Sequence, residues 1–172
     1  METMAIIAVL LFVFLFKKTK NGNNKTEIVN NKLTGFQTGS ICSKYEDDIF
    51  AASIFFKVPA KIIDAICFVE SSDGANTDHA NGEIGIMAVS FAAATDVLKK
   101  YPQLVKEKVT LFDSRGNIAL GTGYLRMCFD RWGNWEQAIV AYNSGINNPS
   151  VNNWGNNYYL KLVQDRLRVK CS

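Results

Sequence analysis

The sequence has a single histidine, His79, and none of its four cysteines stands in a C-x-x-C pair. A standard zinc site needs several such ligands at short spacing, so we expect neither a metal nor another cofactor. Positive charge is also sparse, because the net charge is only +3 and the longest basic cluster is Lys17, Lys18 and Lys20. Nucleic-acid binders concentrate Lys and Arg on one face or in one run, so no nucleic-acid partner is expected.

Alternation of apolar and polar residues, the mark of a β-strand, is missing over any long stretch, and only Glu83–Val89 has room for a short extended piece. Polar loops are expected at 74–85 and 147–157, and Asp113 or Ser114 is suited to cap the helix that follows it. The apolar spacing predicts a mainly α fold with helices over Tyr45–Phe56, Pro59–Ser71, Phe91–Tyr101, Asn117–Arg131, Trp135–Asn143 and Tyr158–Val169.

The four cysteines fall into two pairs of different character. Cys67 and Cys128 lie within apolar helical patterns, which indicates packed rather than reactive thiols. Cys42 and Cys171 lie near the two ends of the folded part. An oxidising compartment would allow them to form a terminal staple, whereas a reducing one would leave them as thiols.

The N-terminal run Met4–Phe16 is unbroken hydrocarbon, followed at once by lysines. Its 13 residues are few for a membrane helix, which needs about 20, but the stems of the flanking lysines lengthen it. A secretory signal peptide is the alternative, yet no basic residue precedes the run and no small-x-small cleavage site follows it. We predict an uncleaved, single-pass anchor at residues 1–18, a flexible Asn-rich linker at 19–40 and one folded domain at 41–172.

One carboxylate falls on an apolar helix face. The helix that begins at Pro59 places four residues at spacings of three, four and seven: Ile63, Ile66, Cys67 and Glu70. Burial disfavours the charged form, so the pKa of Glu70 is expected to rise toward neutrality, as a general acid requires. The alternative is that Glu70 ends its helix and turns into solvent.

Several short motifs follow Glu70-Ser71 in a distinctive order. They are Gly85-Ile86-Met87, Asn117-Ile118-x-x-Gly121-x-x-Tyr124-Leu125, Ala138-x-x-Ala141-Tyr142-Asn143-Ser144-Gly145 and Tyr159-Leu160-x-x-Val163. In this order and spacing the chain resembles the soluble-lytic-transglycosylase-like family, which shares its catalytic core with goose-type lysozyme. The resemblance runs from about Tyr45 to Val169, and its most specific block is Asn117–Gly145. It implies a helical, lysozyme-like domain behind the N-terminal hydrophobic membrane helix.

The resemblance implies a catalytic role for Glu70. The matching residue of the family protonates the glycosidic oxygen between N-acetylmuramic acid and N-acetylglucosamine in bacterial peptidoglycan. It then acts as a base on the C6 hydroxyl of the muramoyl sugar, which attacks the anomeric carbon and leaves a 1,6-anhydro end. Because the substrate supplies its own nucleophile, no second carboxylate is needed, and the sequence has only one acid in a clear motif.

Five further residues match substrate-site positions of the family. Ser71 corresponds to a residue that supports the glutamate and the adjoining loop, and Met87 to one that lines the sugar cleft. Tyr142 corresponds to a tyrosine whose hydroxyl approaches the catalytic carboxylate, and Asn143 to a ligand of the sugar. Tyr159 corresponds to a late tyrosine that closes the same site.

One position departs from the family pattern. The residue after the Gly-Leu-Met motif is usually a Gln whose amide binds sugar, whereas this chain has Ala88. The change weakens one subsite or transfers its work to another side chain such as Gln137 or Asn81. Asp73 and Asp78 offer carboxylates that could activate water, although an Asp in such a loop typically bonds to nearby backbone.

The remaining aromatic residues and the histidine carry less information. Trp132 and Trp135 flank a tight turn between helices and are expected to pack in the core. Trp154, in an Asn-rich loop, suits either the cleft or the core. His79 is expected to be exposed in its loop and receives no role.

The expected function is therefore a lytic transglycosylase that cleaves peptidoglycan glycan strands for local wall opening, in phage genome entry or in envelope remodelling. A hydrolytic muramidase of the same fold is one alternative. A non-catalytic, peptidoglycan-binding membrane protein is another, which Ala88 keeps open. The expected location is the virion membrane of a phage or a bacterial cell envelope, with other virion or envelope-complex proteins as candidate partners.

The lysines behind the anchor bear on its orientation. Lys and Arg flanking a membrane segment favour the cytoplasmic side, which would keep the domain away from peptidoglycan. Either this short anchor escapes the rule, or the protein reaches the wall by another route, such as a virus particle that carries its own membrane.

Overall fold

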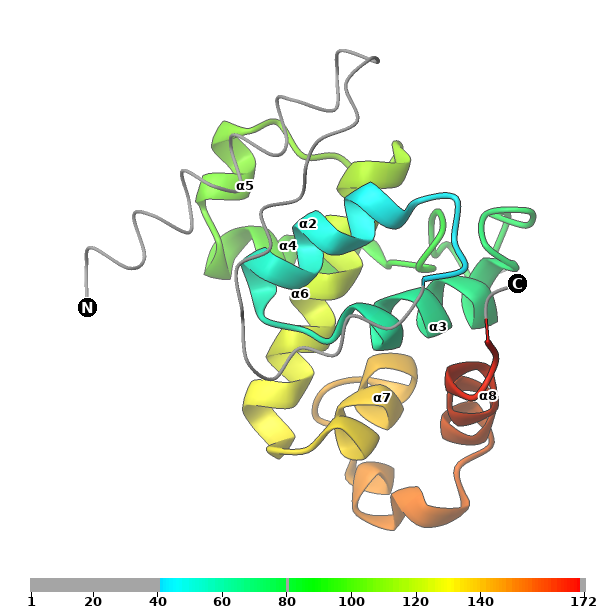
Figure 1. Cartoon of the computed structure of the whole chain (residues 1–172). Helices are drawn as coiled ribbons and strands as arrows, with labels where there is room; N and C mark the ends of the chain where they lie inside the picture. Colours follow the sequence, from blue (N-terminus) through cyan, green and yellow to red (C-terminus); the bar gives the residue numbers. More distant parts are fainter. Residues whose placement is uncertain (1–40, 80, 171–172) are drawn as a thin grey trace.

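The computed structural model describes residues 41–79 and 81–170. Within these residues every regular element is a helix, so the prediction of a mainly α fold is confirmed. The elements follow one another (Figure 1) as α2 (Glu46–Phe56), α3 (Ala60–Ser71), α4 (Phe91–Lys100), α5 (Gln103–Lys106), α6 (Ser114–Trp132), α7 (Trp135–Ser144), the 3₁₀ helix η1 (Pro149–Asn156) and α8 (Tyr158–Leu167).

Most helix boundaries have a local cause in the sequence. Four helices begin with a side chain that accepts a hydrogen bond from the backbone N–H three residues later: Ser90 for α4, Asp113 for α6, Asn134 for α7 and Asn157 for α8. Each such cap stabilises its helix by roughly 1 kcal/mol. Helices α2 and α3 end at Lys57 and Ser72, which both adopt the left-handed conformation that closes a helix.

Two boundaries differ from the predicted ones. Helix α6 begins at Ser114, three residues earlier than expected, because the Asp113 carboxylate accepts a 2.8 Å hydrogen bond from the Gly116 N–H and so draws the preceding turn into the helix. Pro102 ends α4 as predicted, but it also starts the short helix α5, since its fixed φ of −62° suits a first helical turn.

The two predicted loops are also more ordered than expected. Residues 149–156 of the second loop form η1, where the Asn148 side chain accepts a hydrogen bond from the Ser150 N–H. The predicted extended piece is reduced to isolated bridges, in which Ile84 pairs with Asp78 and with Val89. These bridges enclose the tight turn 85–88 and fix it against the rest of the loop.

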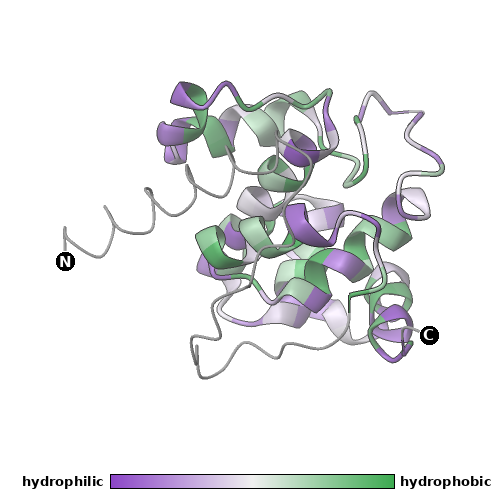
Figure 2. Cartoon of the chain, turned by 45° about the horizontal axis from the view of Figure 1, so that its top comes forward, coloured by the Kyte–Doolittle hydropathy of each residue, from purple (hydrophilic) through white to green (hydrophobic). Residues whose placement is uncertain are grey.

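The core surrounds α6. This helix contacts α2, α4 and α7, while α3 contacts α2 and α8; Figure 1 shows α7 and α8 below α3. In Figure 2 hydrophobic and hydrophilic residues share the same helices, as expected when one face of each is buried. The largest fully buried side chains are Ile49, Val58, Ile63, Ile66, Met87, Val97, Leu104, Ile118, Leu120, Leu125 and Val140. This packing brings the end of α3 against the start of α8.

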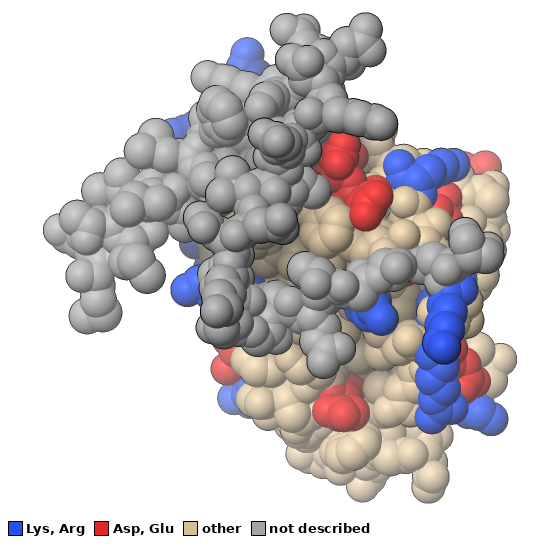
Figure 3. All heavy atoms as spheres, viewed as in Figure 1, with Lys and Arg blue, Asp and Glu red and all other residues tan. Residues whose placement is uncertain are grey.

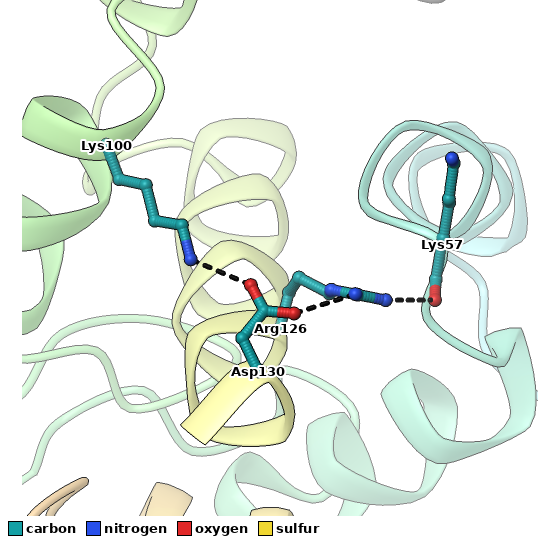
Figure 4. Close-up of polar contacts among 4 residues, drawn as sticks. All are labelled: Lys57, Lys100, Arg126 and Asp130. Atoms are coloured by element: carbon teal, nitrogen blue, oxygen red, sulfur yellow. Dashed lines mark hydrogen bonds and ion pairs between the residues drawn. The ribbon is translucent and has the colours of Figure 1, made fainter. Parts of the chain in front are cut away.

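An ion-pair network joins α4 and α6 to the corner between α2 and α3. The Asp130 carboxylate accepts from Lys100 Nζ and from Arg126 Nη2, both at 2.7 Å, and Arg126 also donates to the Lys57 carbonyl at 3.4 Å (Figure 4). Figure 3 shows both charge signs on the visible face of the described part. Half-exposed pairs of this kind are worth about 1 kcal/mol or less, so they orient the helices more than they stabilise them.

The buried residues bear out two further predictions. Cys67 and Cys128 are buried free thiols, and burial raises the pKa of Cys128 to about 12. Trp132 and Trp135 pack against the core: the Trp132 indole N–H donates to the Ile146 carbonyl, and Trp135 stacks on Phe129. Cys42 is disulfide-bonded, whereas Cys171, with which a terminal staple was considered, lies outside the described residues.

The predicted N-terminal anchor and linker also lie outside the described residues. Among the helices of residues 41–79 and 81–170, none is both long and apolar enough to cross a membrane. The folded domain predicted at 41–172 contains all the helices that the structure describes.

Candidate active site

Glu70 occupies the last turn of α3, where this helix meets the start of α8. Its carboxylate oxygen Oε1 accepts a 2.5 Å hydrogen bond from the hydroxyl of Tyr159. Tyr159 is the second residue of α8, and the Asn157 side chain sets its position by capping that helix at the Leu160 N–H. The carboxylate is half-buried, so the alternative in which Glu70 turns freely into solvent is wrong.

Four influences set the pKa of Glu70, and their sum raises it above the ordinary value. Burial is the largest and raises the pKa, because a charged carboxylate loses hydration. The Tyr159 hydrogen bond lowers it by favouring the charged form. The carboxylate of Glu83 raises it, and His79 lowers it. A carboxyl group that keeps its proton to higher pH than an ordinary Glu is suited to general acid catalysis.

Ser71 holds together the loop that follows Glu70. Its hydroxyl oxygen lies 2.9 Å from the carbonyl oxygen of Ile86 and 3.0 Å from that of Cys67, and it accepts from the Gly74 N–H at 2.8 Å. The side chain is only 1% exposed. Ser71 therefore links the end of α3 to the tight turn 85–88.

Asn117, in the first turns of α6, clamps the same turn from the other side. Its Oδ1 accepts from the Met87 N–H at 2.9 Å, and its Nδ2 donates to the carbonyls of Ile84 and Leu111 at 2.6 and 3.1 Å. Gly85 makes this approach possible, because its φ of +78° favours glycine and a Cβ there would collide with the Asn117 amide. The Gly-Ile-Met and Asn-Ile motifs thus form one structural unit.

The predicted role of Met87 needs correction, and Tyr142 has a bonding partner that the sequence did not predict. The Met87 side chain is fully buried, so it does not line an open cleft. The Tyr142 hydroxyl donates to the Met87 carbonyl at 2.6 Å, whereas the tyrosine bonded to Glu70 is Tyr159. Gly121 permits the Met87–Tyr142 contact, because a Cβ there would lie 2.7 Å from the Met87 sulfur and 3.0 Å from the Tyr142 hydroxyl oxygen. Tyr142 fixes the turn backbone, and Tyr159 contacts the acid.

A hollow of about 270 Å³ lies beside this unit, and it is lined by Glu83, Ala88, Val89, Ser90, Ala93, Tyr124, Tyr142, Asn143, Ser144 and Gly145. Glu70 does not line it. Glu83 and Tyr142 connect the two regions, because both line the hollow and both interact electrostatically with Glu70. Asn143 is exposed at the hollow, where a sugar-binding side chain is expected.

The other residues that the sequence offers as site candidates either lie outside this site or make structural contacts. Asp73 accepts hydrogen bonds from the Ser43 hydroxyl at 2.5 Å and from the Lys44 N–H at 3.3 Å, as expected of a loop-forming Asp. Gln137 bonds to Asn134 in the cap of α7, so it does not replace the missing sugar-binding Gln. Trp154 packs against the core and is not among the residues of the hollow.

The sequence predicts no role for His79 or Glu83, but both influence the pKa of Glu70. His79 is half-buried rather than exposed, and its Nε2 lies 2.8 Å from the Gly85 carbonyl oxygen, which closes the loop onto the turn. Glu83, rather than Asp73 or Asp78, is the acid whose charge raises the pKa of Glu70. Its position two residues before Gly85 was the only signal in the sequence. No group of three or more potential metal ligands occurs in the described part of the chain.

Comparison with known proteins identifies the domain. The family model described as the transglycosylase SLT domain matches residues 48–165, a span that includes nearly all of α2 and α8 and everything between them. Searches of curated proteins and of solved structures found no significant match. The match covers well over half of the chain and contains every residue of the site described above. The chain therefore belongs to the transglycosylase SLT domain family, within the lysozyme-like superfamily.

Proposed function

We propose that this chain is a peptidoglycan lytic transglycosylase that cleaves the MurNAc-(β1,4)-GlcNAc bond, with Glu70 as its catalytic residue. The observation that carries the proposal is the half-buried Glu70 carboxylate at the end of α3, bonded to Tyr159 and shifted toward its protonated form, within a transglycosylase SLT domain. A family assignment alone indicates peptidoglycan cleavage in general, whereas this carboxylate supplies the chemistry for it.

The proposed reaction uses one carboxyl group twice. Protonated Glu70 donates its proton to the glycosidic oxygen as the bond from that oxygen to C1 of the muramoyl sugar breaks. The resulting carboxylate then accepts the proton of the C6 hydroxyl while O6 forms a bond to C1. The 1,6-anhydro ring closes, Glu70 is protonated again, and no water is consumed. Tyr159 donates to the carboxylate and so stabilises the form that exists between the two proton transfers.

A hydrolytic muramidase is the second candidate, and one observation favours it. Hydrolysis needs a second carboxylate to activate water or to form a glycosyl intermediate. The charge of Glu83 influences the pKa of Glu70, so a second carboxylate is present although the sequence motifs contain only one.

Mass spectrometry of the products separates the two reactions. Purified sacculi digested with the full chain are expected to yield muropeptides with 1,6-anhydro-muramoyl ends, which are lighter than the hydrolysis products by one water. A matched digest with a hydrolytic lysozyme supplies the reference for reducing ends. Reducing ends alone from this chain would rule out the transglycosylase in favour of the muramidase.

We also propose that the enzyme acts from a membrane, in a phage virion or in a bacterial envelope, with Met4–Phe16 as its anchor. The unbroken apolar composition of that run, extended by the stems of the lysines behind it, supports the proposal. The full chain is expected to sediment with membranes and to resist extraction by high salt, whereas a chain lacking residues 1–18 is expected to remain in the supernatant. Equal distribution of the two chains would contradict anchoring by this segment.

A further inference from the structure

The hollow beside the tight turn 85–88 is lined by a carboxylate, that of Glu83, which the family motifs do not predict. Ala88, which stands where the family usually has a sugar-binding Gln, lines this hollow with a side chain of one methyl group. Asn143 lines the hollow from the end of α7. Glu83 lies in the loop just before the turn and is the only ionisable carboxyl group among the described residues that line this hollow.

The surroundings of Glu83 leave it available for a ligand. It is half-exposed, and the residue that follows it is held twice: Ile84 pairs with Val89, and the Asn117 amide donates to the Ile84 carbonyl. The backbone next to Glu83 is thus fixed, while Glu83 itself lines a concave space. Rigid support of this kind is what a binding side chain requires.

We propose that Glu83 is a second functional carboxylate of this site, which binds the hydroxyl groups of a glycan sugar in the hollow beside Ala88. A carboxylate accepts hydrogen bonds from sugar hydroxyls, and bonds to a charged acceptor are stronger than those to an amide. Glu83 thereby replaces the acceptor function that Ala88 lacks, and Asn143 provides donors across the same hollow. The inference rests on the proposed peptidoglycan substrate.

The position of Glu83 also couples binding to catalysis. Tyr159 from α8 bonds to the Glu70 carboxylate, and the other ionisable groups that interact electrostatically with Glu70 are Tyr142 from α7 and His79 and Glu83 from the loop. The Glu83 charge raises the pKa of Glu70, so a sugar bound to Glu83 sits beside an acid that keeps its proton to higher pH.

Binding is tested without turnover. The full chain in detergent carries Glu70→Gln, and its affinity for a soluble MurNAc–GlcNAc oligosaccharide is measured with and without a second substitution. Glu83→Ala is expected to weaken binding at least about tenfold, and Glu83→Gln less, because the amide oxygen still accepts. Glu107→Ala, which removes an equal charge from the end of α5, is expected to stay within about twofold. Unchanged affinity of the Glu83→Ala chain overturns the proposal.

The pH dependence of kcat/KM distinguishes an effect of Glu83 on Glu70 from a purely structural role of Glu83. Cleavage requires protonated Glu70, so kcat/KM falls as pH rises through its pKa. Glu83→Gln is expected to move this alkaline limb to lower pH, and Tyr159→Phe to move it to higher pH, because the two groups have opposite effects on Glu70. Glu107→Gln serves as the matched control. A limb that stays in place for Glu83→Gln refutes the coupling of Glu83 to Glu70, whereas unchanged affinity refutes the proposed sugar binding.

The two proposals fail in different ways. If the wild-type chain cleaves sacculi but Glu83→Ala leaves oligosaccharide affinity unchanged, only the role of Glu83 is refuted. If affinity depends on Glu83 but the wild-type chain cleaves no peptidoglycan, the proposed enzyme function is refuted while Glu83 remains a glycan-binding residue.

Discussion

Glu70→Gln is expected to reduce peptidoglycan cleavage by about 10²- to 10⁴-fold, the range over which a positioned acid and base accelerates a reaction. Gln has nearly the same size and keeps an oxygen that accepts from Tyr159, but it has no proton to give to the glycosidic oxygen. The measurement is the release of soluble muropeptides from purified sacculi. Glu107→Gln, an equal change at the end of α5, is the control and is expected to retain wild-type activity.

The same substitution should not destabilise the fold. Because burial raises the pKa of Glu70 in the folded chain, its contribution to stability is present at low pH and is lost as pH rises through that pKa. At higher pH the buried charge opposes folding, and Gln removes it. The free energy of unfolding of the Glu70→Gln chain at neutral pH is therefore expected to equal or exceed that of the wild type. Full cleavage activity in a well-folded Glu70→Gln chain would refute the assignment of the acid.

Asn117→Ala is expected to lower the free energy of unfolding by about 3 kcal/mol, the largest stability effect that we predict. The substitution leaves the Met87 N–H and the carbonyls of Ile84 and Leu111 without their partner. Met87 and Leu111 are buried, so water cannot replace the lost amide without a rearrangement of the turn. Urea denaturation followed by circular dichroism measures the change.

The control for this prediction is Asn147→Ala, which truncates an exposed Asn behind α7 and is expected to change stability by less than about 0.5 kcal/mol. Asn117→Ala is also expected to reduce cleavage, because the turn it clamps carries Ala88 and adjoins Glu83. A stability loss below about 1 kcal/mol would show that the turn is held mainly by Ser71 and the Ile84–Val89 pair, rather than by Asn117.

Local patterns in the sequence account for much of this protein. The spacing of apolar residues predicts the main helices to within a few residues, because helical periodicity and capping groups such as Asp113 act over a single turn. The same spacing places Glu70 on the buried face of α3, and the family motifs link it to Ser71, Asn143 and Tyr159. The sequence did not predict the short helices α5 and η1. Each follows a turn, at Pro102 and at Asn148, whose conformation these residues allow but do not require.

Which side chains meet depends on how the helices pack. Tyr142 and Tyr159 are both tyrosines of the motif blocks, yet only the packing of α8 against α3 brings Tyr159 to Glu70, while the space at Gly121 directs Tyr142 to the Met87 carbonyl. Glu83 has no periodic signal, because it lies in an irregular loop whose path is set by contacts with α3 and α6, at the far ends of long sequence separations. Local periodicity and residue type are enough to predict the main helices and the place of Glu70 on α3, whereas its role as the acid is implied by the family motifs. The partners of that acid and the hollow beside it depend on distances between segments far apart in the chain, and only the folded structure specifies these.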